Sequence, residues 1–202
     1  MPGRHGAGTE SLTKEIVNLE QPRPARDFPA LLQNTVLEHT AFAYYLPANA
    51  ELKGMTYPVR NAVKVVLLND ANELLLMCMD DPTITSIGEK YHGRFWTLIG
   101  GEIEPNETIR DAAEREVFEE TGLTRDDIEF GPQVWSGELD LILKGKPAHI
   151  RQEFIVARTR RRDISLVNLT GDEKEVVKQV SWFSLDRIIN SGEVIHPVLL
   201  PK

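Results

Sequence analysis

The part of the sequence that most restricts the fold is a strand pattern followed by two glycines and an acidic helix pattern. The apolar run Phe95–Ile99 predicts a strand, which Gly100-Gly101 stops. The helical pattern that follows begins after Asn106, which we expect to be the N-cap. Gly122 is the natural residue to end this helix in a left-handed conformation. A strand, a tight turn and a helix in this order predict an α/β fold.

Two glutamates of this helix lie on the face that should be buried. With Ile109 at zero and a step of about 100° per residue, Glu116 falls near about 340° and Glu120 near about 20°. Ala113, near about 40°, belongs to the same small apolar stripe. Glu119, near about 280°, lies beside the stripe. The pattern therefore points carboxylates toward the protein body.

Buried carboxylates need a neighbouring group or ion that compensates their negative charge. Glu116 and Glu120 stand at i and i+4, where like charges repel. Taking each from water costs several kcal/mol unless arginines, protonation or divalent cations offset the charge. Carboxylate oxygens are the ligands that Mg²⁺ and Mn²⁺ prefer. The helix face therefore favours a metal site over a solvated surface.

The residues around the helix complete a family motif. The Nudix box, G-x5-E-x7-R-E-U-x-E-E-x-G-U with U aliphatic, is matched at every defined position by Gly101-x5-Glu107-x7-Arg115-Glu116-Val117-x-Glu119-Glu120-x-Gly122-Leu123. Seven identities at background frequencies of about 5–7% each arise by chance in roughly one window in 10⁹. The chain resembles a Nudix hydrolase, of the kind of MutT-like pyrophosphohydrolases. The resemblance implies an α/β/α sandwich with a mixed β-sheet and a catalytic loop-helix.

The resemblance also implies an activity. Nudix hydrolases cleave a nucleoside diphosphate linked to another group, by attack of water on a pyrophosphate phosphorus in the presence of Mg²⁺ or Mn²⁺. We expect a nucleotide substrate such as a (modified) nucleoside triphosphate. An ADP-ribose or nucleotide-sugar pyrophosphatase is one alternative, although Glu138 stands where many ADP-ribose hydrolases have proline. A non-catalytic nucleotide sensor is another, but sensors often lose a metal glutamate.

The same resemblance assigns the residues of the box. Glu116, Glu119 and Glu120 correspond to the metal-binding carboxylates, and the carbonyl of Gly100 to a further ligand. The pair corresponding to Glu107 and Arg115 mainly holds the loop and helix in place in the family, and we count both in the catalytic set.

The general base varies within the family, and several carboxylates are candidates. Glu119 is the first. A glutamate in the loop before the last core strand is the second, which is Glu173 or Glu175 here, and Glu175 is our choice from that loop. Glu153, inside a predicted strand, is the third. A carboxylate near the attacking water can accept its proton.

The chain divides into three parts. Residues 1–34 are rich in Gly, Pro and charge, and predict a flexible extension. Residues 35–60 carry aromatic side chains and should pack on the domain or on a dimer partner. Residues 61–202 form the predicted Nudix hydrolase domain, with further strands or helices expected at 62–68, 74–79, 133–143, 149–157, 176–183 and 185–190.

The composition restricts the cellular compartment and the expected partners. No apolar run is long enough to span a membrane, and the N-terminal residues lack a secretory signal pattern. A single cysteine permits no internal disulfide, so we expect a cytoplasmic protein. The net charge of −8 argues against binding duplex nucleic acid. The expected partners are a nucleotide and a second copy of the chain in a homodimer.

Overall fold

The computed structural model describes residues 57–86 and 93–196. The predictions for residues 1–34 and for most of 35–60 lie outside the described residues. The helices and strands, in chain order, are β1 (Val59–Leu68), β2 (Leu74–Met79), β3 (Ile84–Ser86), β4 (Phe95–Leu98), α2 (Ile109–Thr121), η2 (Arg125–Asp127), β5 (Ile128–Leu143), β6 (Lys146–Thr159), α3 (Gly171–Val176), β7 (Val177–Phe183), α4 (Leu185–Asn190) and β8 (Ile195–His196).

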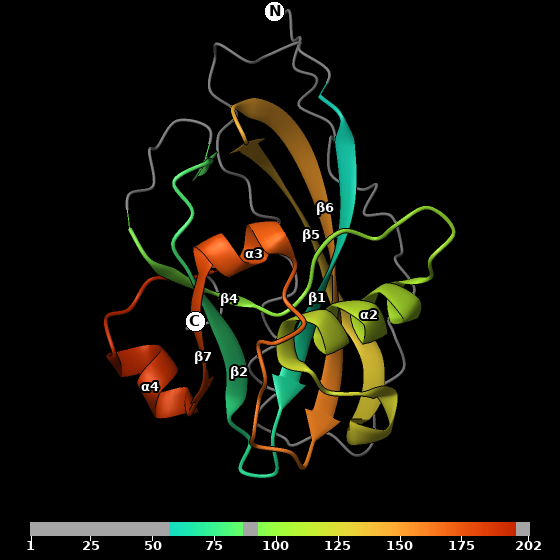
Figure 1. Ribbon diagram of the computed structural model, residues 1–202, viewed down its shortest axis with the longest axis vertical. Helices are drawn as coiled ribbons and strands as arrows, with labels where there is room; N and C mark the ends of the chain where they lie inside the picture. Colours follow the sequence, from blue (N-terminus) through green and yellow to red (C-terminus); the bar gives the residue numbers. More distant parts are fainter. Residues whose placement is uncertain (1–56, 87–92, 197–202) are drawn as a thin grey trace, which may run out of the picture.

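The strands form one sheet with mixed directions. Its order is β3-β5-β6-β1-β2-β4-β8, and β7 pairs with β2. β1 runs parallel to β6, whereas β5 and β6 form a long antiparallel hairpin that extends over much of the height of the molecule (Figure 1). β1 pairs with β2 at Leu68 and Leu74. Isolated bridges join β1 to the chain that leaves β4, at Val65–Ile99 and Ala62–Glu102. The glycine turn is therefore held against β1.

Buried side chains cover both faces of the sheet. On one face, α2 packs its alanines and Val117 against Val63 and Val65 of β1. On the other face, Ile188 of α4 belongs to a second buried cluster with Phe154 and neighbouring residues. Figure 1 shows α2 and α4 on different sides of the strands. The predicted α/β/α sandwich with a mixed sheet is confirmed. Among the described helices, none has the length and apolar character needed to cross a membrane.

The helix of the box begins two residues later than predicted. Thr108, and not Asn106, is the N-cap of α2, since its hydroxyl accepts a hydrogen bond from the backbone N–H of Asp111 at 3.1 Å. Asp111 returns the contact by accepting from the backbone N–H of Thr108 at 3.2 Å. Asn106 instead takes a positive φ of 73° in the preceding loop. Gly122 ends the helix with a φ of 73°, as predicted.

Four short elements, β3, η2, α3 and β8, were not predicted, and β3 and α3 bear on the sheet and on the site. β3 lies within a segment interpreted as loop, and it extends the sheet by pairing with β5. α3 lies within a polar segment interpreted as turns, and Glu173 supports its start by accepting a hydrogen bond from the backbone N–H of Thr170 at 2.8 Å. Three and six residues are too few for a periodic pattern to show. α3 nevertheless contributes to the site described next.

Candidate metal centre

Two glycines let the backbone of the turn after β4 lie close to β1 and α2. Gly100 has a φ of 126°, and a Cβ there would lie 2.2 Å from the carbonyl oxygen of Val63. A Cβ on Gly101 would lie 2.5 Å from a carboxylate oxygen of Glu116. The backbone N–H of Val63 donates to the carbonyl of Gly101 at 2.9 Å. A side chain at position 100 would push the turn away from β1, and one at position 101 would displace the carboxylate of Glu116.

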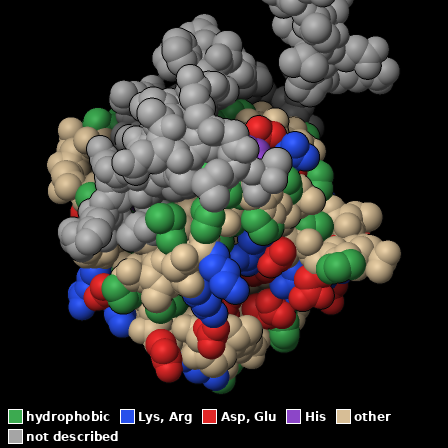
Figure 2. Space-filling view, turned by 90° about the horizontal axis from the view of Figure 1, so that it is seen from above, with side chains coloured by type: hydrophobic (Ala, Val, Ile, Leu, Met, Phe, Trp, Pro, Cys, Tyr) green, Lys and Arg blue, Asp and Glu red, His purple; other side chains and the backbone are tan. Residues whose placement is uncertain are grey.

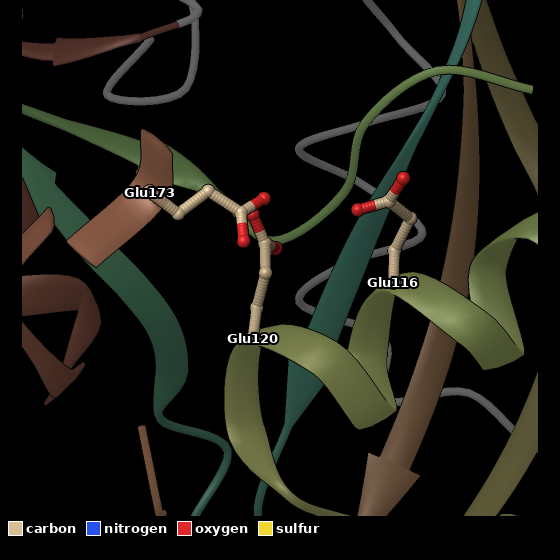
Figure 3. A group of neighbouring side chains, drawn as sticks. All are labelled: Glu116, Glu120 and Glu173. Atoms are coloured by element: carbon tan, nitrogen blue, oxygen red, sulfur yellow. The ribbon is translucent and has the colours of Figure 1, made fainter. Parts of the chain in front are cut away.

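Three glutamates converge next to this turn. Glu116 and Glu120 come from the buried face of α2, with exposed fractions of 5% and 3%. Glu173 reaches them from α3 (Figure 3). One carboxylate oxygen from each lies within 4.8 Å of the others. Oxygen ligands of one Mg²⁺ lie about 3–4 Å apart, so a small adjustment lets these three carboxylates share a cation. The predicted inward orientation of Glu116 and Glu120 is confirmed.

Burial makes Glu116 and Glu120 hard to ionise without a cation. Desolvation raises the pKa of Glu120 to about 8, and this effect is only partly offset by Lys64 and by a hydrogen bond from the backbone N–H of Gly100 at 2.7 Å. Desolvation also raises the pKa of Glu116, against the lowering effect of Arg115. A divalent cation would remove the mutual repulsion and favour the charged forms.

Arg115 ties the loop of the box to its helix. Its guanidinium donates to both carboxylate oxygens of Glu107, at 2.8 and 2.9 Å, and to the carbonyl of Glu102 at 2.8 Å. It also donates to Glu116 at 2.8 Å and to Glu119 at 3.1 Å. The hydrogen bonds from Arg115 lower the pKa of Glu107 to about 2. This bidentate pair, with the bond to the Glu102 carbonyl, joins the loop of the box to α2.

The structure separates the remaining candidate bases. Glu119 lies beside the three-glutamate group with a side chain that is 30% exposed, and Arg115 holds its carboxylate. Glu175 is exposed and outside the group, because residues two apart on a helix point in different directions. Of the two glutamates in that loop, Glu173 is the one that reaches the site. Glu153, also outside the group, accepts a hydrogen bond from Gln133, and desolvation raises its pKa.

Sequence reasoning missed Lys64. This residue lies in the middle of β1, and its ammonium donates to the carbonyl of Gly100 at 2.7 Å. Burial lowers the pKa of Lys64, while the charges of Glu120 and Glu116 act in the opposite direction. A lysine within an apolar strand pattern was the available signal, and nothing local in the sequence connects it to the box.

The surface shown in Figure 2 does not separate the charges. Acidic and basic side chains lie beside one another on the described part of this face. The described part of this face therefore carries charges of both signs.

Comparison with known proteins gives the family. A family model described as the NUDIX domain matches residues 58–202, which is well over half of the chain. The chain belongs to the Nudix family. Its box supplies two of the three clustered glutamates, Glu116 and Glu120, whereas Glu173 comes from α3 outside the box.

A curated relative supports the Nudix assignment. Nudix hydrolase 19, chloroplastic, from Arabidopsis thaliana is 31% identical over 133 residues. The alignment covers 65% of this chain and 26% of that protein, so the chain spans about a quarter of the length of this relative.

Several solved structures are also similar to this chain. A MutT protein from Methanosarcina mazei Go1 is 23% identical, with 69% of this chain and 87% of that chain covered and a TM-score of 0.46. A C. elegans Ap4A hydrolase binary complex is 23% identical, with coverages of 64% and 83% and a TM-score of 0.45. The E. coli dihydroneopterin triphosphate pyrophosphohydrolase is 18% identical, with coverages of 65% and 84% and a TM-score of 0.48.

Proposed function

We propose that this Nudix chain hydrolyses the pyrophosphate linkage of a nucleotide in the presence of Mg²⁺ or Mn²⁺, and that its substrate is a nucleoside triphosphate, including modified ones. The observation that supports this most is the group formed by Glu116, Glu120 and Glu173. Two of these carboxylates are buried on a helix face that the fold could have filled with apolar side chains. A structure that needs a cation there is suited to a polyanionic substrate.

The donor set fits a hard divalent cation. Glu116, Glu120 and Glu173 would hold it, since each offers carboxylate oxygen and none offers sulfur or nitrogen. When bound, the cation neutralises phosphate oxygens and lowers the pKa of coordinated water. The chain's own residues keep the ligands in place. The backbone N–H of Gly100 fixes one oxygen of Glu120, and Arg115 fixes one oxygen of Glu116.

Glu119 is the general base in this proposal. Its carboxylate is accessible, lies on the same helix as the buried pair, and is oriented by Arg115. A base in this position can accept the proton of the attacking water while the phosphorus–oxygen bond forms and the pyrophosphate leaves. Glu175 is the alternative base, with an exposed carboxylate on α3, two residues after the cluster residue Glu173. Glu119 also stays a predicted metal ligand.

A substrate panel tests the function. The full chain is incubated with nucleoside triphosphates, modified triphosphates, ADP-ribose and nucleotide sugars, with Mg²⁺, Mn²⁺ or EDTA, and the products are identified by mass spectrometry. We expect a nucleoside monophosphate and pyrophosphate from a triphosphate, with no turnover in EDTA. Preferred cleavage of ADP-ribose or of a nucleotide sugar would show that the substrate is not a nucleoside triphosphate. Tight nucleotide binding without turnover would identify a sensor instead.

Matched variants separate the roles of the glutamates. Glu119→Gln should lower kcat at least about a hundredfold, the size typical of general-base loss, and leave a folded protein. Glu175→Gln should match the wild type if Glu119 is the base, and the exposed Glu129→Gln serves as the control. The opposite result, with loss of kcat in Glu175→Gln alone, would move the base to α3.

The cytoplasm is the proposed compartment. The single cysteine, Cys78, is buried and free, as in proteins that keep their thiols reduced. A homodimer remains a proposal from the aromatic residues within 35–60, most of which lie outside the described part of the chain.

A further inference from the structure

Two exposed cations lie at the end of the sheet where β1 begins and the β5–β6 hairpin turns. Arg60 is the second residue of β1, and its side chain is 42% exposed. Lys144 lies in the hairpin turn, with a side chain that is 76% exposed. The parallel strands β1 and β6 pair from Val59 and His149 onward, so both strands begin at this end. Arg60 and Lys144 therefore belong to one region of the surface.

The chain after the glycine turn connects Arg60 to the carboxylate centre. The Nε atom of Arg60 lies 2.9 Å from a carboxylate oxygen of Glu102, which directly follows Gly101. The carbonyl of Glu102 accepts from Arg115, and the same guanidinium donates to Glu116 of the centre. Arg60 is therefore held beside the turn that lines the centre.

Lys144 is tied to the helix that carries the third glutamate. Its ammonium lies 2.6 Å from a carboxylate oxygen of Asp172, which directly precedes the cluster residue Glu173 on α3. The hydrogen bond to Asp172 is the main effect that raises the pKa of Lys144, and the charge of Arg60 acts against it. The two cations are thus close enough to interact electrostatically, and each pairs with an acid next to a residue of the centre.

Neither cation is saturated by its carboxylate. In the part of the chain that the structure describes, the ion pair of Arg60 with Glu102 involves Nε, which leaves both terminal nitrogens of the guanidinium able to donate. Lys144 donates to Asp172 and has two further N–H groups. Exposed ion pairs contribute little to stability, so a polyanion can replace either carboxylate at low cost. Guanidinium and ammonium groups bind phosphate oxygens strongly.

We propose that Arg60 and Lys144 bind the phosphate groups of the nucleotide that the metal does not hold, and that each then exchanges its carboxylate partner for phosphate oxygens. This inference rests on the proposed function, because it needs a nucleotide at the carboxylate centre. A chain of three phosphates carries more charge and reaches further than a chain of two, so these cations favour a triphosphate over a diphosphate. Figure 2 looks onto this end of the molecule and shows basic side chains directly beside acidic ones.

Binding of α,β-methylene-ATP tests the proposal without turnover, since its α–β linkage resists hydrolysis. The full chain is titrated with this analogue in Mg²⁺, and the affinity is measured by calorimetry. We expect Arg60→Met and Lys144→Met each to bind at least about fivefold more weakly, because a charge-assisted hydrogen bond to phosphate is lost. Arg60→Lys and Lys144→Arg keep the charge and should restore most of the affinity.

The carboxylate partners provide a test of opposite sign. Glu102→Gln and Asp172→Asn remove the acids that compete with phosphate, so both variants should bind the analogue about threefold more tightly. If the ion pairs only stabilise the fold, neither variant gains affinity.

Two further cations serve as matched controls. Arg151→Met removes an exposed strand arginine from a similar ion pair, in which Nε lies 3.0 Å from Glu138. Lys146→Met removes an exposed lysine two residues after Lys144. Both controls change the net charge by the same amount as the test variants, and both should bind the analogue like the wild type.

Steady-state hydrolysis of ATP separates substrate binding from chemistry. Arg60→Met and Lys144→Met should raise KM about fivefold and leave kcat within about twofold, since neither side chain touches the reacting atoms. The ratio of kcat/KM for ATP to kcat/KM for ADP should fall in the same variants. Loss of kcat with an unchanged KM overturns the role of these cations.

The outcomes separate this inference from the proposed function. Unchanged affinity in both Arg60→Met and Lys144→Met overturns the role of the two cations and leaves the proposed function standing. A wild type that binds the analogue without hydrolysing any nucleotide of the substrate panel contradicts the proposed function alone, and the binding data still decide the role of the cations. Absence of binding by the wild type at millimolar analogue overturns both.

Discussion

Replacing Glu120 by Gln should stabilise the metal-free protein at alkaline pH. Glu120 is 3% exposed, and desolvation raises its pKa from 4.5 to about 8. The folded protein therefore holds this proton more tightly than the unfolded chain does. Because the folded pKa is the higher one, the free energy of unfolding falls as the pH rises from about 4.5 to about 8. Gln keeps the volume of the side chain and never ionises.

The expected size follows from the pKa difference. At 1.36 kcal/mol per pKa unit, the rise from 4.5 to about 8 corresponds to on the order of 5 kcal/mol. Relaxation and water penetration reduce the cost of a buried charge, so we expect ~2–5 kcal/mol. In a domain of this size, 1 kcal/mol shifts the melting temperature by about 2–4 °C. Glu120→Gln should therefore melt at least about 4 °C above the wild type at pH 8.5 in EDTA.

Circular dichroism melts in EDTA at pH 5 and pH 8.5 measure this difference. The two proteins should melt together at pH 5, where Glu120 is protonated in the folded state, and separate at pH 8.5. Added Mn²⁺ should stabilise the wild type and have little effect on Glu120→Gln, which should also lose turnover. The exposed Glu129→Gln is the control and should follow the wild type. Coincident melting of Glu120→Gln and the wild type at both pH values would refute the reasoning.

Four further predictions concern the glycine turn, the pair formed by Arg115 and Glu107, the N-terminal residues and the dimer. Gly101→Ala puts a Cβ 2.5 Å from a cluster carboxylate, so Mn²⁺ affinity and turnover should each fall at least about tenfold in a folded protein; unchanged Mn²⁺ titrations would argue against this crowding. Arg115→Ala removes the pair with Glu107 and should cost ~2–3 kcal/mol in urea unfolding. Removal of residues 1–34 should leave the metal-dependent rate intact, and loss of folding would reveal a packed element. Light scattering of the wild type should give twice the 22.8 kDa chain mass, and the double variant Tyr44→Glu with Tyr45→Glu should give a smaller mass. A monomeric wild type rejects the dimer.

The sequence by itself determined which side chains of the box helix face the metal centre. The 3.6-residue period places Glu116 and Glu120 on the apolar stripe, because both residues belong to one regular element whose geometry is local. The box glycines and Arg115 are equally local, since the loop and helix that they join are neighbours in the chain. The cap was harder to predict. Asn106 and Thr108 are both suitable residues, and only the reciprocal contact with Asp111 decides between them.

Only the tertiary structure decided what surrounds those carboxylates. Glu173 arrives on a six-residue helix more than fifty residues beyond α2, and Lys64 reaches Gly100 across 36 residues of sequence. The pKa of Glu120 depends on how completely the sheet and these segments exclude water. Desolvation and the attraction between charges act through space, so residue order along the chain does not specify them. The sequence therefore determines which carboxylates point inward, and the packing of distant segments determines their charge, their partners and what they can bind.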